Sequence, residues 1–230
     1  GESVWVRDNA SLNGTRLYVP GAGIINQKRT EREANHGIDA GVAEKTRRGR
    51  EVSEDRSIVK LSHGLFGVFD GVGGEWGGAA AADMAAAQLN ARIQRAPTDA
   101  FRQTAPHLAE EWLRETLDSI SQNISEHAGV GFTTATVARV VDSHEGQVVV
   151  WASIGDSRLY HVRDGRAKQV TVDEGEGRFL ARCLGNERPW DRNIQQTGRI
   201  VLKPGEKIVL VTDGITGDYG DDLMRETELY

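Results

Sequence analysis

The stretch 66–71 reads FGVFDG, an apolar run that ends in Asp-Gly, and it is the most informative part of the sequence. The stretch 208–214, IVLVTDG, repeats the pattern, and the stretch 152–157, ASIGDS, places its glycine before the acid. Short apolar runs bounded by glycine predict buried strands. An aspartate directly after such a strand presents its carboxylate at the sheet edge, and the adjacent glycine leaves room for a ligand. Carboxylates of this kind suit a hard cation such as Mg²⁺ or Mn²⁺, and the candidate ligands are Asp70, Asp156 and Asp213.

A single Asp-Gly pair predicts a hairpin turn more readily than a metal site, because short motifs often match by chance. Two strongly apolar strands that end in Asp-Gly, together with the Gly-Asp-Ser stretch, reverse that preference. Glu54 and Asp55 add an acidic pair just before a further predicted strand, with Arg50 upstream. Alone, such a pair indicates a solvated turn. Beside the three aspartates it becomes a candidate for the outer shell of the metal site.

The order of the predicted elements indicates an α+β protein. The predicted strands are 38–43, 56–61, 65–70, 133–141, 147–154, 158–163, 167–172 and 208–212. Two predicted helices, 78–95 and 99–127, fall between the third and fourth of these strands. Strands, then helices, then strands favour α+β over an alternating parallel α/β fold. We expect residues 1–35 to be an N-terminal extension, with short strands at 4–7 and 16–19, and residues 36–230 to form the main domain.

Composition excludes several classes of function. The chain has 230 residues, 38% hydrophobic and 27% charged, as expected of a soluble globular domain. The net charge of -6 argues against a nucleic-acid groove. No apolar run approaches the ~20 residues that a membrane helix needs. Cys183 is the only cysteine, which excludes an internal disulfide framework and favours a buried small apolar residue. With no signal peptide at its N-terminus, we expect a cytoplasmic protein.

Six motifs in order resemble those of the metal-dependent Ser/Thr protein phosphatases of type 2C. The motifs are REVSED at 50–55, VFDGVGG at 68–74, GFTTA at 131–135, IGDSR at 154–158, CLG at 183–185 and VTDGI at 211–215. Each motif alone is weak, but six in sequence are specific. The resemblance implies two antiparallel sheets packed face to face with a helix pair outside each.

The resemblance also implies a role for each site residue. Asp70 would bridge two Mg²⁺ or Mn²⁺ ions, with the Gly71 carbonyl on one ion and Asp213 on the other. Glu54 and Asp55 would hold metal-bound waters, and Asp156 would serve a third, weaker ion. Arg50 would grip the substrate phosphate through its guanidinium fork. A water bridged by two metals would then attack phosphorus, without a covalent enzyme intermediate.

Two positions depart from the family pattern. Val72 stands where the signature has a histidine, which favours a bacterial type and leaves the general acid unassigned. The family's closing Asp-Asn-x-Thr motif, whose aspartate is a metal ligand, has no counterpart after Asp213. Asp8 and Asn9 match the first two residues of this motif, but they lie near the N-terminus and no apolar strand follows them.

The leading hypothesis is a phosphatase that acts on phosphoserine or phosphothreonine in the protein substrates of Ser/Thr kinases. The alternative is a catalytically impaired pseudophosphatase that binds a partner, which Val72 and the absent closing motif favour. Five charged residues that would converge on the site count against that alternative, because charge repulsion among them costs stability without a cation. They are Arg50, Asp55, Asp70, Asp156 and Asp213. A glycosidase built on paired carboxylates ranks last, since it would need only two acids and no Asp-Gly glycines. The sequence indicates neither the substrate nor the oligomeric state.

Overall fold

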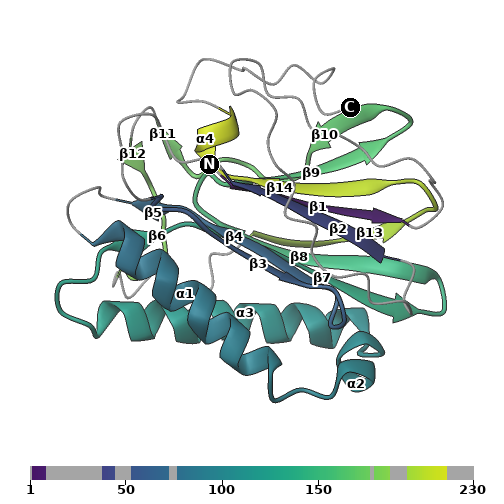
Figure 1. Ribbon diagram of the computed structural model, residues 1–230, viewed down its shortest axis with the longest axis horizontal. Helices are drawn as coiled ribbons and strands as arrows, with labels where there is room; N and C mark the ends of the chain where they lie inside the picture. Colours follow the sequence, from purple (N-terminus) through teal and green to yellow (C-terminus); the bar gives the residue numbers. More distant parts are fainter. Residues whose placement is uncertain are drawn as a thin grey trace.

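The computed structural model describes residues 2–8, 38–44, 53–72, 77–176, 179–186 and 196–216. Within them, two five-stranded antiparallel sheets form the centre of the protein (Figure 1). The first sheet has the order β10-β9-β14-β1-β2, and the second has the order β13-β8-β7-β4-β3. Helices α1 and α3 cover the outer face of the second sheet (Figure 1). The expected α+β fold of packed antiparallel sheets is confirmed.

The element bounds are as follows. The first sheet contains β1 (Glu2–Asp8), β2 (Ile38–Glu44), β9 (Arg158–Arg163), β10 (Arg166–Gln169) and β14 (Lys207–Val211). The second contains β3 (Arg56–Lys60), β4 (Leu65–Phe69), β7 (Ala135–Ser143), β8 (Gly146–Ile154) and β13 (Gln196–Leu202). Two short ladders pair β5 (Gly71–Val72) with β6 (Phe132–Thr133) and β11 (Gly175–Glu176) with β12 (Phe179–Leu180). The helices are α1 (Gly78–Ile93), α2 (Thr98–Arg102), α3 (Pro106–Ser125) and α4 (Asp213–Thr216).

Strand β4 explains why a continuous apolar run precedes Asp70. All five of its residues are buried, because the second sheet is covered on both faces. Phe66 and Val68 belong to the apolar cluster between the two sheets. Leu65 and Phe69 belong to the cluster beneath α1 and α3. The strand is thus packed on both faces, which fixes the position at which Asp70 follows it.

Strand β1 lies between β14 and β2 in the first sheet, with Ser3 opposite Val211 and Val4 opposite Val42. The strand expected at 4–7 is therefore confirmed, and it runs over residues 2–8. It begins at the end of the sheet where α4 lies, and it contacts that helix (Figure 1). The strand expected at 16–19 falls outside the described residues, and the boundary near residue 35 stays a prediction.

Three expectations about the elements are wrong in detail. The helix expected at 99–127 is two helices, because Pro106 occupies the first turn of α3 and the preceding Ala105 is extended, with ψ of 141°. The strand expected at 133–141 is divided at Thr134 into β6 and β7, and the strand expected at 167–172 is β10, which ends at Gln169. Strand β13 was not expected, since its sequence QTGRIVL is half polar and it lies at the sheet edge.

Cys183 is buried as expected, and burial raises the pKa of its thiol to about 11. In the part of the chain that the structure describes, none of the helices combines the length and apolar character needed to cross a bilayer.

Candidate active site

Asp70 follows β4 directly, and the junction between β6 and β7 fixes its backbone. The Asp70 N–H donates to Thr134 Oγ1 at 3.1 Å. Its carbonyl accepts from the Thr134 N–H and from Thr133 Oγ1, each at 2.8 Å. Both threonines are fully buried. These bonds set the position from which the Asp70 carboxylate extends.

Two other carboxylates meet Asp70 from separate elements. Asp55 precedes β3 and is buried, and Asp213 opens α4 directly after β14 and Thr212. The Thr212 hydroxyl donates to Asp55 Oδ2 at 3.2 Å, which joins the ends of β3 and β14. Burial, the negative charges of Asp213 and Asp55, and hydrogen bonds with both raise the pKa of Asp70 to about 10. Without a cation, Asp70 therefore holds a proton at neutral pH.

This arrangement suits a hard divalent cation. Its donors are all oxygen, as Mg²⁺ and Mn²⁺ prefer, and a cation would displace the proton and remove the repulsion. No group of three or more His, Cys, Asp or Glu side chains within the described ranges already has the spacing of a metal centre. Asp55 and Asp213 are nevertheless joined to Asp70 by hydrogen bonds and repel it, and carboxylates held together by a proton on Asp70 need not have the spacing that a metal imposes.

Gly71 occupies a place that no other residue would fit. A Cβ there would lie 2.5 Å from the carbonyl carbon of Gly78 and 2.6 Å from its oxygen. The backbone of β5 thus runs directly against the first turn of α1. The facing Gly78 is equally constrained, since a Cβ there would lie 2.8 Å from the Gly71 carbonyl carbon. The glycine of the Asp-Gly pair therefore has a packing role in addition to its expected role as a ligand.

Asp156 lies in the turn between β8 and β9, next to Gly155, whose φ is 101°. Burial, reinforced by the charge of Asp213, raises the pKa of Asp156 to about 6. Glu174 holds this turn from outside. Its carboxylate accepts from the Gly155 N–H at 3.1 Å, and its own N–H donates to the Gly155 carbonyl at 3.0 Å. Because the charge of Asp213 contributes to the raised pKa of Asp156, the two carboxylates lie close enough to interact.

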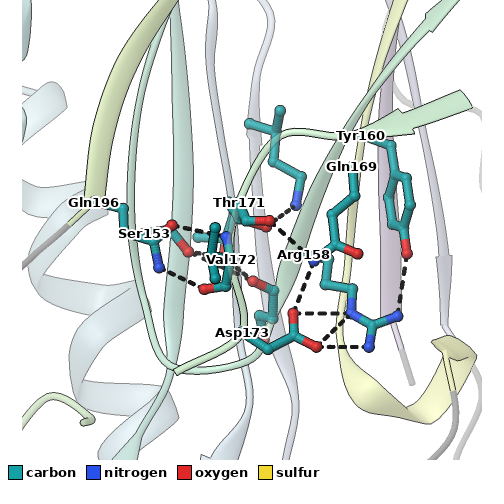
Figure 2. A network of polar contacts seen from close by, with 11 residues as sticks. Ser153, Arg158, Tyr160, Gln169, Thr171, Val172, Asp173 and Gln196 are labelled. Atoms are coloured by element: carbon teal, nitrogen blue, oxygen red, sulfur yellow. Dashed lines mark hydrogen bonds and ion pairs between the residues drawn. The ribbon is translucent and has the colours of Figure 1, made fainter. Parts of the chain in front are cut away.

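The segment that carries Glu174 is tied down by side chains from three strands (Figure 2). Arg158 of β9 donates to both carboxylate oxygens of Asp173, at distances from 2.6 to 3.0 Å. Gln169 also donates to Asp173, at 2.9 Å. Gln196 of β13 bonds the backbone N–H and carbonyl of Val172, as a neighbouring strand would. The network anchors the chain that leads to the Asp156 turn.

The other predicted site residues have different outcomes. Glu54 is half-buried beside Asp55, and its role in the site stays a prediction. Arg50 lies outside the described residues. The sequence reasoning missed Asp173 and Glu174. An acidic pair directly after the strand predicted at 167–172 was the available signal, although the pair of Glu54 and Asp55 precedes its strand and does not follow it.

A family model described as Stage II sporulation protein E (SpoIIE) matches residues 37–229. The chain belongs to the SpoIIE family. Solved structures show that this SpoIIE-family chain shares the fold of bacterial PPM Ser/Thr phosphatases, which confirms the expected resemblance. Stp1, a Ser/Thr phosphatase from Staphylococcus aureus, is 23% identical with a TM-score of 0.63, over 77% of this chain and 76% of Stp1.

Two further structures are similar to the SpoIIE-family chain. PppA of Pseudomonas aeruginosa, described as a key regulatory component of T6SS, is 22% identical with a TM-score of 0.62, over 75% of each chain. The PPM Ser-Thr phosphatase MsPP of Mycobacterium smegmatis is 24% identical with a TM-score of 0.52, over 72% of this chain and 73% of MsPP. A search of curated protein sequences finds no match to the chain.

Proposed function

We propose that the chain is a Mg²⁺- or Mn²⁺-dependent phosphatase that hydrolyses phosphoserine or phosphothreonine in proteins. The observation that carries the proposal is the meeting of Asp55, Asp70 and Asp213, where burial and neighbouring charges raise the pKa of Asp70 to about 10. A protein that only binds a partner gains nothing from carboxylates that repel one another, whereas in a metal enzyme the bound cation offsets their repulsion. Membership of the SpoIIE family and the phosphatase fold support the same function.

Each residue of the site would have a role in binding metal, water or phosphate. Asp70, the Gly71 carbonyl and Asp213 would hold two divalent cations, and Asp156 would hold a third. Asp55 and Glu54 would accept hydrogen bonds from water in the site. Arg50 would orient the phosphoryl group by paired N–H donors. When bound, the cations supply Lewis-acid activation of water and of the phosphoryl group. The buried Thr133 and Thr134 keep the Asp70 backbone in place.

A second candidate is a pseudophosphatase that keeps the fold as a binding module. Val72 at the place of the family histidine favours it, as does the lack, among the described residues, of acidic side chains already spaced as a metal centre. The two candidates differ in metal binding. Calorimetric titration of the full chain with Mn²⁺ at pH 7.5 should release heat and protons for the phosphatase, and phosphate release from a phosphothreonine peptide should then depend on Mn²⁺. A folded chain that neither binds Mn²⁺ nor releases phosphate would support the binding module and refute the proposal.

A further inference from the structure

Phe132 is a large apolar side chain left uncovered beside the candidate active site. In the described ranges, four large apolar residues are exposed, and Phe132 is the aromatic one, with 42% of its surface accessible. It belongs to none of the three apolar clusters that the described residues form. An exposed phenyl ring offers a large contact area at low cost in conformational entropy. If it lies close to Asp70, it can contact a substrate bound at the site.

The ladder between β5 and β6 places Phe132 close to the site. Phe132 is directly opposite Val72, so the two side chains lie on the same face of the ladder. Val72 is two residues beyond Asp70, a distance of roughly 7 Å along an extended chain. The half-buried Val72 and the exposed Phe132 thus form an apolar pair next to the carboxylates. Figure 1 shows β5 and β6 at the same end of the sheets as α4, which begins with Asp213.

The backbone on both sides of Phe132 is fixed. The Gly131 N–H donates to the Gly77 carbonyl at 3.1 Å. Thr133 bonds Leu184 in both directions, at 2.8 and 3.3 Å, and its hydroxyl donates to the Asp70 carbonyl. The Phe132 backbone is therefore held in a constant relation to Asp70, while its side chain is not used in the core. Rigid presentation of this kind lowers the entropic cost of binding.

We propose that Phe132, with Val72, is a specificity-determining contact for phosphoprotein substrates that carry an apolar residue next to the phosphorylated one. This inference rests on the proposed function. A substrate chain whose phosphoryl group reaches Asp70 continues at about 3.5 Å per residue, so its neighbouring residues lie over this pair. The occupant is the substrate polypeptide, because the apolar pair is continuous with the carboxylates whose cations would bind its phosphoryl group.

The test uses two phosphothreonine peptides that differ only in the residues flanking the phosphothreonine, leucine in one and serine in the other. For binding, a phosphonate that hydrolysis cannot cleave replaces the phosphate, and fluorescence anisotropy is measured with the full chain and Mn²⁺. We expect the wild type to bind the leucine-flanked peptide about tenfold more tightly, and Phe132→Ala to bring this ratio close to one. Phe132→Leu should keep most of the preference. Leu108→Ala, at another exposed apolar residue on α3, should leave the ratio unchanged.

Each other outcome has a definite meaning. A Phe132→Ala protein with the wild-type ratio, or one that loses affinity for both peptides equally, would overturn the inference. A wild type that binds both peptides equally would also overturn it, while leaving the proposed function intact. A wild type that binds neither analogue and cleaves neither phosphopeptide would refute the proposed function and the inference together. Thermal unfolding of Phe132→Ala within a few degrees of wild type checks that the variant is folded.

Discussion

Replacing Asp70 by asparagine should stabilise the metal-free protein while removing its metal site. The pKa of Asp70 is about 10 in the native protein and 3.8 in its ordinary state, so at neutral pH the native protein holds a proton that the unfolded chain releases. Stability is therefore lost as pH rises from about 4 towards 10. At about 1.4 kcal/mol per pH unit, the cost at pH 7 has a ceiling of about 4 kcal/mol. Relaxation of Asp55 and Asp213 lowers it, so we expect a gain of about 1–4 kcal/mol for asparagine.

The assay is thermal unfolding in EDTA between pH 4 and 8. For a chain of this size, 1 kcal/mol corresponds to about 2–4 °C in Tm. The Asp70→Asn protein should melt above the wild type at pH 7, and the difference should shrink towards pH 4. With Mn²⁺ the order should reverse, because only the wild type gains free energy from the bound ion. The matched control is Asp164→Asn, at an exposed turn residue with φ of 49° that asparagine also adopts, and its Tm should hardly change.

Two results would refute this reasoning. A lower Tm for Asp70→Asn in EDTA at pH 7 would show that the three carboxylates do not repel one another. A stability difference that does not depend on pH would show that no proton is held at Asp70. In either case the carboxylates would not form the cluster from which the metal site is argued.

Three further substitutions test how the site is held. Gly71→Ala should lower the free energy of unfolding by about 1–3 kcal/mol in a urea titration, because its Cβ would lie 2.5 Å from the Gly78 backbone; an unchanged midpoint would mean that α1 gives way freely. Thr134→Val should cost about 1–3 kcal/mol, because it leaves the half-buried Asp70 N–H and the buried Ser157 hydroxyl without their Thr134 partner, and a loss below about 0.5 kcal/mol would contradict the role of Thr134 in fixing Asp70. Arg158→Lys should lower Tm by a few degrees, because a single ammonium cannot reproduce the paired bonds to Asp173. An equal Tm would show that those bonds contribute nothing to stability.

The parts of the fold that the sequence predicts are those where local pattern and burial agree. The runs before Asp70 and Asp213 are apolar because β4 and β14 are buried, and both strands were expected within a residue or two. Strand β13 was not predicted, because its sequence QTGRIVL begins with a polar half and, at the sheet edge, none of its residues is buried. The place of β1 between β14 and β2 depends on pairing over some 200 residues, which no local signal contains.

In the candidate site, too, local sequence predicted some features and not others. Asp70, Asp156 and Asp213 were visible as acids at strand ends, but their meeting followed from family resemblance, since spacing along a chain does not determine which strand ends are neighbours. The hydrogen bonds between Thr134 and the Asp70 backbone could not be predicted, because a threonine between two strands has no distinctive sequence pattern. Glu174 was missed although it stands in an acidic pair after a predicted strand, because it acts through the backbone of Gly155 and belongs to none of the motifs that indicated the site.

Phosphate release from a phosphothreonine peptide shows whether the protein is a metal-dependent phosphatase. It should be measured for wild type, Asp70→Asn and the Asp164→Asn control, each with Mn²⁺ and with EDTA. We predict that wild type and control release phosphate only with Mn²⁺, and that Asp70→Asn, although folded and more stable without metal, releases none. Release that continues in EDTA, or that survives in Asp70→Asn with Mn²⁺, would contradict the account.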